Sequence, residues 1–181
     1  MKESFIAGQK LYLRGLKKND LCGAMFNWAN DSKVTYYMCM GLKPNSMELM
    51  EEEYSQLIHS DKDVVFAIVD KKTGAHIGNV GLYAINWVAR SAEYRIVIGE
   101  RKYHGKGYGT ETAKLIVAYA FDKLNLNKVF LGVNAENKTA IKSYKNSGFV
   151  EEGRARQEIY RNGRYYDAIT MSILREEFYA G

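Results

Sequence analysis

The stretch Arg101-Lys-Tyr-His-Gly-Lys-Gly-Tyr-Gly-Thr110 lies between a strand-like run at 92–98 and a helix-like run at 111–124. Glycine occupies every second position from Gly105 to Gly109, and residues without a Cβ atom let successive backbone N–H groups approach one ligand. The positive end of the following helix favours an anion at the same place. A strand, a glycine turn and a helix in this order therefore predict a phosphate-binding turn.

The glycine spacing excludes two common phosphate-binding loops. A Walker loop needs Gly-x-x-x-x-Gly-Lys-Ser/Thr, and a dinucleotide-binding fingerprint needs Gly-x-Gly-x-x-Gly. The glycines at 105, 107 and 109 fit neither pattern. Lys106 adds a cation to the turn, although such a lysine is often only a solvated surface residue. The turn alone leaves the phosphate compound open.

A second segment narrows the choice. The apolar run at 129–133 predicts a buried strand, and a short helix follows it, with a glycine as its stop signal. Asn137, Ala140, Tyr144, Gly148 and Phe149 form the pattern Asn-x-x-Ala-x-x-x-Tyr-x-x-x-Gly-Phe. Together with His-x-x-Gly-x-Gly upstream, this pattern resembles the GNAT superfamily of acetyl-CoA-dependent N-acetyltransferases. The resemblance covers nearly the whole chain and is similar to the branch of ribosomal-protein-alanine and spermidine N-acetyltransferases.

The resemblance implies acetyl-CoA as cosubstrate and no metal. Its pantetheine arm would lie between two splayed strands, bound by free backbone groups of Ile96, Val97 and Ile98 as in strand addition, and by Asn137. The implied pyrophosphate site comprises His104, Gly105, Lys106, Gly107, Tyr108, Gly109 and Thr110. The family usually carries Gln or Arg at position 104. His104 is therefore expected to support the turn and not to act as a base.

Two residues are candidates for proton transfer. The resemblance makes Tyr144 the general acid for the leaving thiolate, because a phenol is protonated at neutral pH. Glu93 is the candidate base for the incoming ammonium, directly or through a chain of water molecules. The alternative roles are packing for Tyr144 and an ion pair with Arg95 or Arg90 for Glu93. The expected acceptor pocket comprises Asp31, Asn86, Trp87, Tyr94 and Asn134.

The sequence leaves the acceptor open between a small amine, such as a polyamine, amino sugar or aminoglycoside, and a peptide or protein amine, such as that of a ribosomal protein. Acidic residues at 48 and 51–53 slightly favour a polyamine, whereas the net charge of +5 slightly disfavours a cationic substrate. A non-catalytic acetyl-CoA-binding regulator is the alternative from another class. The presence of Tyr144 and of the three glycines argues against it.

Composition gives further expectations. A length of 181 residues predicts a single domain over 1–181. Lysine and arginine are interleaved with acids, which disfavours a nucleic-acid partner. The isolated Cys22 and Cys39 favour a reducing cytoplasm, and three scattered histidines indicate no metal site. The absence of a leader or a long apolar run predicts no membrane association.

Hydrophobic periodicity predicts an α/β fold. The expected strands lie at 10–15, 64–69, 76–83, 90–98, 129–133, 151–160 and 165–174, and the expected helices at 20–29, 46–58, 111–124 and 138–148. Asn162-Gly163 is a strong hairpin signal between the last two strands. Their tyrosines form the candidate face of a homodimer. The predicted architecture is a mixed, mostly antiparallel, twisted sheet with helices on both faces.

Overall fold

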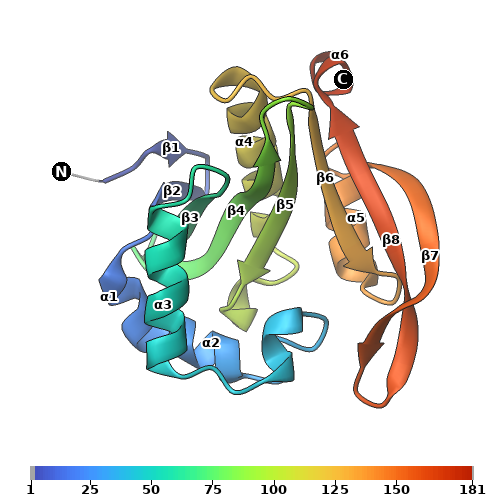
Figure 1. The fold of residues 1–181 in the computed structure, drawn as a ribbon. Coiled ribbons are helices and arrows are strands. Elements are labelled where there is room, and N and C mark those ends of the chain that lie inside the picture. The colour runs from blue at the N-terminus through green and yellow to red at the C-terminus, as the bar shows by residue number, and fades with distance from the viewer. Residues whose placement is uncertain (1–2, 181) are drawn as a thin grey trace.

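The computed structural model describes residues 3–180, which are built around one eight-stranded sheet (Figure 1). The strand order is β1-β2-β3-β4-β5-β6-β8-β7. Neighbouring strands pair antiparallel except β5 and β6, which run parallel. The strands are β1 (Ile6–Ala7), β2 (Leu11–Gly15), β3 (Val64–Asp70), β4 (His76–Asn86), β5 (Ser91–Ile98), β6 (Lys128–Asn134), β7 (Val150–Arg161) and β8 (Arg164–Leu174). The predicted mixed and mostly antiparallel sheet is confirmed.

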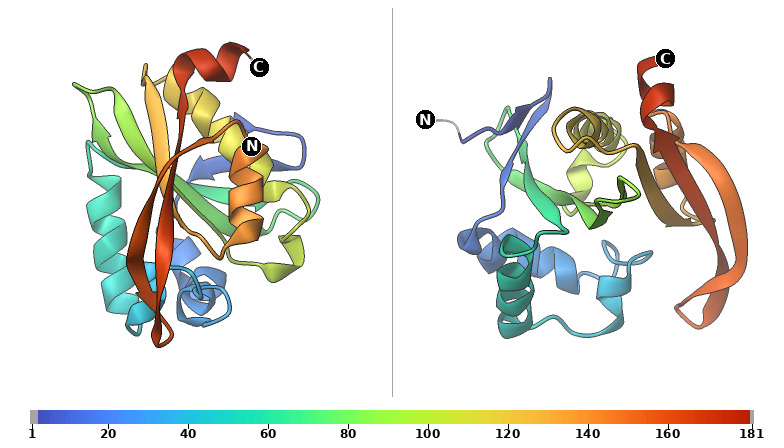
Figure 2. Two further views of the ribbon diagram at one scale, coloured as in Figure 1. Left: turned by 90° about the vertical axis from the view of Figure 1, so that its right-hand side faces the viewer. Right: turned by 45° about the horizontal axis from the view of Figure 1, so that its top comes forward.

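Helices cover both faces of the sheet, as predicted. In Figure 1, α3 stands in front of the strands and α4 and α5 lie behind them, and Figure 2 shows the same layers from two other sides. The helices are α1 (Lys18–Asp20), α2 (Phe26–Asn30), α3 (Met47–Ile58), α4 (Tyr108–Asp122), α5 (Lys138–Lys145) and α6 (Arg175–Ala180). Apolar residues at three- and four-residue spacing bury one face of α4 against the strands, and this layer forms the main core.

Short sequence signals set several of the element ends. Ser46 caps α3 by accepting a hydrogen bond from the backbone N–H of Leu49 at 3.3 Å. Asn162 and Gly163 join β7 to β8 with φ values of 50° and 82°, which is the backbone of a two-residue hairpin. Gly148 has a φ of 95° just after α5. The helix predicted to begin at Ser46, the hairpin turn at Asn162-Gly163 and the role of Gly148 as the glycine that ends the preceding helix are confirmed.

Two of the predicted helices are wrong in part, one in its continuity and one in its start. The helix expected over 20–29 is broken at Cys22 and Gly23, and Gly23 has a φ of 128° that helices do not contain. The helix after the glycine turn begins at Tyr108 and not at Glu111, because Gly107 is its N-terminal cap residue with a φ of 85°. The positions from Tyr108 to Thr110 therefore already belong to the helix.

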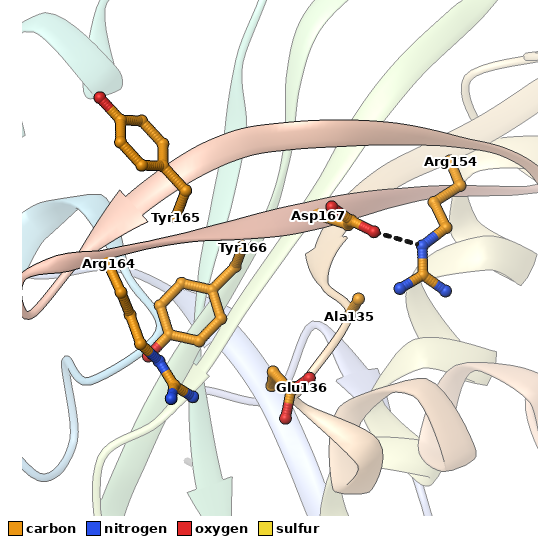
Figure 3. Close-up of a pocket in the computed structure, with 7 residues that line it drawn as sticks. All are labelled: Ala135, Glu136, Arg154, Arg164, Tyr165, Tyr166 and Asp167. Atoms are coloured by element: carbon orange, nitrogen blue, oxygen red, sulfur yellow. Dashed lines mark hydrogen bonds and ion pairs between the residues drawn. The ribbon is translucent and has the colours of Figure 1, made fainter.

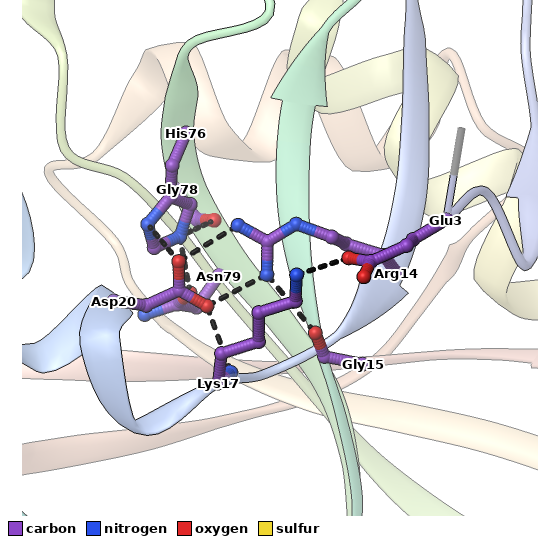
Figure 4. Close-up of polar contacts among 8 residues, drawn as sticks. All are labelled: Glu3, Arg14, Gly15, Lys17, Asp20, His76, Gly78 and Asn79. Atoms are coloured by element: carbon purple, nitrogen blue, oxygen red, sulfur yellow. Dashed lines mark hydrogen bonds and ion pairs between the residues drawn. The ribbon is translucent and has the colours of Figure 1, made fainter. Parts of the chain in front are cut away.

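A compact polar cluster ties α1 to the sheet (Figure 4). Both guanidinium nitrogens of Arg14 on β2 donate to the carboxylate of Asp20 at 2.7 Å. Burial opposes ionisation of Asp20, but the hydrogen bonds from Arg14 and the backbone of Lys17 prevail and lower its pKa. His76 on β4 lies 3.7 Å from the same carboxylate, and burial lowers the pKa of its imidazole. The cluster holds the N-terminal helices against β2 and β4.

None of the helices within residues 3–180 combines the length and the apolar composition needed to cross a membrane.

Candidate active site

The two parallel strands β5 and β6 diverge after three paired positions. Ser91, Ala92 and Glu93 pair with 128–130, whereas 94–98 of β5 have no partner on β6, a strand that the structure describes in full. Figure 1 shows the two strands separating toward the end of the molecule that carries α2. The β4–β5 hairpin marks the closed end of this splay, and the glycine turn follows its open end. The structure therefore contains a gap between strands of the kind that an extended ligand can fill.

Backbone groups of β5 alternate between the splay and β4. The N–H of Gly99 donates to Ile77 at 2.9 Å, so the odd-numbered residues of β5 direct their backbone groups toward β4. The carbonyl of Val97 accordingly lies against Gly78 of β4. The prediction that Val97 offers free backbone groups is wrong for this reason. Ile96 and Ile98 carry the groups that face the splay.

The glycine turn lies between β5 and α4 and is open. Gly105 and Gly107 have φ values of 70° and 85°, which residues with a Cβ rarely adopt. A Cβ at Gly105 would meet no atom of residues 3–180 within 4 Å, so a ligand can approach the backbone there. The N-terminus of the 15-residue α4 adds its unpaired N–H groups. The open turn is formed by Gly105, Lys106, Gly107, Tyr108, Gly109 and Thr110, and its backbone and the helix N-terminus have the geometry that favours an anion.

His104 joins the turn to the end of β5. Its Nε2 lies 2.7 Å from the carbonyl oxygen of Ile98, and because that oxygen only accepts, Nε2 carries the proton. The side chain is exposed, and its other nitrogen has no hydrogen-bond partner among the described residues. This geometry supports the expected role of His104 in holding the turn. The His104 imidazole also occupies the Ile98 carbonyl oxygen, which would otherwise be free to bind a ligand in the splay.

We expect His104→Gln to retain most of the transferase activity, because a carboxamide N–H can replace the imidazole N–H at the Ile98 carbonyl. The measurement is kcat and the KM for acetyl-CoA in the purified variant. A general base contributes about a hundredfold or more, so a loss of kcat on that scale would identify His104 as a base and contradict the supporting role.

Tyr144 projects from α5 into an aromatic group at the splay. Its ring centroid lies 6.0 Å from that of Tyr94 on β5 and 5.9 Å from that of Phe149. Burial raises the pKa of Tyr144 to about 12, so its hydroxyl remains protonated through the neutral range. Tyr94 is only 2% exposed and belongs to the core, which contradicts its prediction as a lining of the acceptor pocket. Its hydroxyl has no hydrogen-bond partner in the described part of the chain.

Glu93 is the last residue of β5 that pairs with β6 before the two strands diverge, and its side chain lies on the opposite face of β5 from Tyr94. Arg95 donates to its carboxylate at 2.7 Å, and the Arg95 guanidinium lies 4.8 Å from the centre of the Tyr83 ring. Burial, followed by the charges of Glu53, Asp63 and Glu93, raises the pKa of Tyr83 to about 12, while Arg95 opposes the shift. Three carboxylates thus act on Tyr83, the β4 residue that pairs with Glu93. Both the base role and the ion-pair role of Glu93 agree with its position beside Arg95.

Asn134, the last residue of β6, and Asn137, just after it, both have their side-chain oxygens occupied. Asn137 caps α5 by accepting from the N–H of Ala140 at 3.2 Å, which its position before a helix could have indicated. Asn134 accepts from the N–H of Glu136 at 2.9 Å, and its buried Nδ2 has no partner within residues 3–180. A buried amide donor without a partner is costly and is commonly satisfied by a ligand or water. Asn134 therefore offers a free donor at the end of β6, and its place on the acceptor side stays a prediction.

The remaining three predicted acceptor residues are dispersed. Asn86 and Trp87 form the β4–β5 turn at the closed end of the splay, where Asn86 Oδ1 accepts from two backbone N–H groups and the Trp87 indole donates to the carbonyl of Asp61. Their polar groups are engaged by these contacts, so their role as acceptor residues stays a prediction. Asp31 lies beyond the open end and lines a cavity of about 530 Å³ with Trp28 and Glu100.

A second cavity, of about 310 Å³, lies at the open end of the splay (Figure 3). None of its lining residues was predicted from the sequence. Arg154 pairs with Asp167 at 2.7 Å, and the Arg164 Nε donates to the Tyr166 hydroxyl at 2.6 Å. The other lining residues are Ala135, Glu136 and Tyr165. These residues come from two segments, after β6 and on the hairpin, and only the fold brings them together.

Within residues 3–180 no group of three or more His, Cys, Asp or Glu side chains is placed to hold a metal ion.

Comparisons with known proteins agree with this geometry. Residues 10–150 match the family model of the acetyltransferase (GNAT) domain. Spermidine N(1)-acetyltransferase of Vibrio cholerae is 35% identical over 170 residues, covering 93% of this chain and 95% of that protein. The Escherichia coli K12 enzyme of the same name is 38% identical over 168 residues, covering 93% and 88%. A Vibrio cholerae spermidine N-acetyltransferase crystallised with CoA and spermine has a TM-score of 0.86 at 35% identity, covering 95% of this chain and 99% of that one.

Proposed function

The chain belongs to the GNAT acetyltransferase family, and we propose that the acceptor of its acetyl group is the primary amine of a small molecule, with polyamines as the first class to test. The protein is an acetyl-CoA-dependent N-acetyltransferase. The observation that carries the proposal is the splay between β5 and β6, which ends at an open glycine turn and has Glu93 and Tyr144 on its opposite faces.

The described residues fit acetyl-CoA without rearrangement of the sheet. Backbone groups of Ile96 and the N–H of Ile98 would hold the pantetheine arm, since His104 occupies the Ile98 carbonyl, and the turn from Gly105 to Thr110 would hold the pyrophosphate. Acetyl-CoA supplies the acetyl group as a thioester. Positioning an amine next to such a group contributes several kcal/mol to the barrier reduction without any covalent intermediate on the protein.

The two titratable side chains would move the protons. Glu93 would accept a proton from the incoming ammonium, directly or through water, because only the neutral amine is a nucleophile. Tyr144 would donate the proton of its hydroxyl to the leaving sulfur, and its raised pKa keeps that proton available at neutral pH. Tyr144 of α5 lies on the Tyr94 side of β5 and Glu93 lies on the other side, so the acid can serve the leaving sulfur while the base serves the incoming amine.

The charges near Glu93 support a cationic acceptor. Glu53 on α3, Asp63 before β3 and Glu93 all act on Tyr83 of β4, where Arg95 is the one opposing positive charge. The two relatives named above bear names of spermidine acetyltransferases. Amino sugars remain the second small-molecule class, because the cavity beside Glu136 is lined by polar side chains, among them Asp167 and Tyr166, that can form hydrogen bonds with sugar hydroxyls.

We expect Glu93→Gln to lower kcat by roughly ten- to a hundredfold, at or below the usual contribution of a general base, because water can partly replace it. The variant keeps the shape of the side chain and a partner for Arg95. The measurement is kcat against pH with a saturating acceptor. If the loss disappears at a pH where the free amine is already neutral, Glu93 acts as the base; a loss that is equal at every pH would assign it to substrate positioning instead.

A substrate screen tests the proposed function. Acetyl-CoA consumption would be followed with polyamines, amino sugars, aminoglycosides and short peptides at equal amine concentration. The proposal expects the highest kcat/KM for a polyamine or another small amine. A preference for peptides by more than about tenfold would contradict the small-molecule assignment.

We also infer that residues 1–181 act as one domain and that the enzyme works in the cytoplasm. The single continuous sheet supports the first inference, and the absence of a disulfide framework in the sequence supports the second. A homodimer through the β7–β8 hairpin remains part of the proposal. Tyr160 and Tyr165 lie there with ring centroids 4.9 Å apart, and more than half of each residue is exposed.

A further inference from the structure

Two tyrosines, one just before the glycine turn and one within it, have their hydroxyls close to the same carboxylate. This carboxylate is that of Asp70 at the end of β3. Tyr108, the first residue of α4, donates to Asp70 Oδ1 at 2.6 Å. Tyr103, just before the turn, lies 3.5 Å from Asp70 Oδ2. The two rings pack edge to face with centroids 5.0 Å apart. The two ends of the turn are therefore fastened to the same point of the sheet.

Asp70 is itself fixed in place. It is 2% exposed, and its Oδ2 accepts from the backbone N–H of Thr73 at 3.0 Å and from the Thr73 hydroxyl at 2.7 Å. Burial opposes ionisation of Asp70, but the hydrogen bonds from Tyr108 and Thr73 prevail and its pKa is lowered. The hydrogen bond to Asp70 raises the pKa of Tyr108 to about 12. A carboxylate and a neutral phenol thus form a charge-assisted hydrogen bond, which is stronger than a neutral one.

Lys10, next to β2, fixes the orientation of the peptide that opens α4. Its Nζ donates to the carbonyl of Lys106 at 2.8 Å, and its backbone N–H donates to Glu111 Oε1 at 2.9 Å. In a trans peptide the C=O and N–H point in opposite directions. Because the Lys106 carbonyl faces Lys10, the N–H of Gly107 faces away from β2, toward the open side of the turn.

We propose that Asp70 and Lys10 are positioning residues for acetyl-CoA, holding the glycine turn in the conformation that presents its N–H groups to the pyrophosphate. The inference rests on the proposed function, because it assumes that the turn binds CoA. Three glycines leave the free turn with many accessible conformations. The apparent dissociation constant of a ligand rises as the population of the competent conformation falls, so loosening these contacts weakens CoA binding without changing any group that touches the acetyl carbon.

The first test removes a single hydroxyl. Tyr108→Phe keeps the ring and its contact with Tyr103 but loses the hydrogen bond to Asp70. We expect the CoA dissociation constant from calorimetry and the KM for acetyl-CoA to rise by about tenfold, the change for a turn that is competent one-tenth of the time. The kcat at saturating acetyl-CoA should change by less than about twofold. Tyr119→Phe is the matched control, since it removes a hydroxyl from the same helix far from the turn, and its CoA affinity should stay within about twofold.

Three further variants test the positioning role through the Lys10 and Asp70 contacts. Lys10→Met should also weaken CoA binding by about tenfold, whereas Lys114→Met, on the exposed side of α4, should leave it unchanged. Asp70→Asn should weaken binding at least as much as Tyr108→Phe, provided that thermal melting shows a folded protein. If Asp70→Asn does not fold, Tyr108→Phe and Lys10→Met decide the matter.

The outcomes separate the inference from the proposed function. Wild-type CoA affinity in both Tyr108→Phe and Lys10→Met would overturn the inference, and so would a loss of kcat with an unchanged KM for acetyl-CoA. Failure of the wild-type protein to bind CoA at all would overturn the proposed function, and the inference with it.

Discussion

Tyr144→Phe is expected to lower kcat by about ten- to ten-thousandfold, the span associated with loss of a general acid. The phenyl ring can keep its contacts with Tyr94 and Phe149, so the melting temperature should barely change. CoA affinity should also hold, because the turn and the splay, and not this ring, anchor the cosubstrate. The loss belongs in kcat because the proton is needed only as the bond to sulfur breaks.

The pH dependence of the chemical step is a second test of the general-acid role of Tyr144. The pKa of Tyr144 is raised to about 12 by burial, so its hydroxyl is protonated below that pH and is lost as a donor only above it. The rate of the chemical step should therefore show no decline due to Tyr144 between about pH 7 and 10. Single-turnover measurements must accompany kcat, because slow product release can hide the step. An unaffected chemical step in Tyr144→Phe would make the residue a packing group.

Gly105→Asp is expected to weaken CoA binding by at least about a hundredfold. The φ of 70° at this position strains any residue with a Cβ, but a Cβ there would have no neighbour among the described residues within 4 Å, so the side chain meets no atom and adds a negative charge at the open side of the turn. Two unit charges about 5 Å apart repel by roughly 3 kcal/mol at an effective dielectric constant near 20. Calorimetric titration with CoA measures the effect.

Gly105→Asn is the matched control, since asparagine has the same shape without the charge and tolerates a positive φ. Its CoA affinity should fall far less than that of the aspartate variant. Equal losses in both variants would show that side-chain bulk, not charge, matters at position 105. Unchanged affinity in a folded Gly105→Asp would remove the pyrophosphate from this turn. Gly107 is less suitable for this substitution. A Cβ there would lie 3.1 Å from Lys10 Nζ, which can pair with the new carboxylate and mask its charge.

Local patterns were sufficient to predict most of the sheet and the position of the glycine turn. The turn at Asn162-Gly163, the cap at Ser46 and the apolar face of α4 each depend on residues close together in the chain. The same is true of Tyr144, whose motif places it on a short helix beside the diverging strands. The family comparisons confirm the fold and the cosubstrate that these motifs implied.

Contacts between distant segments could not be read from the sequence. The Asp70–Tyr108 and Lys10–Lys106 contacts join residues 38 and 96 positions apart. Tyr94 was expected in the acceptor pocket, but a tyrosine beside a buried strand position can turn either its ring or its hydroxyl toward the ligand, and here the ring completes the core. The break at Gly23 needs a positive φ, which the apolar spacing of the surrounding residues does not reveal.

One error was avoidable from the sequence. Successive residues of a strand direct their backbone groups to opposite neighbours, so Ile96, Val97 and Ile98 could not all face the same gap. The period of two, applied to the backbone as well as to the side chains, would have excluded Val97.

The most direct test of the central claim mixes the purified protein with acetyl-CoA and spermidine and follows both the release of free CoA thiol and the mass of the amine. If the protein transfers acetyl groups with Tyr144 as the general acid, thiol release will require both reactants. The acetylated amine will form in an equal amount, and Tyr144→Phe will lose both signals. Binding of CoA without acetylation of spermidine or of any other amine in the screen would contradict the account and favour a non-catalytic acetyl-CoA-binding role.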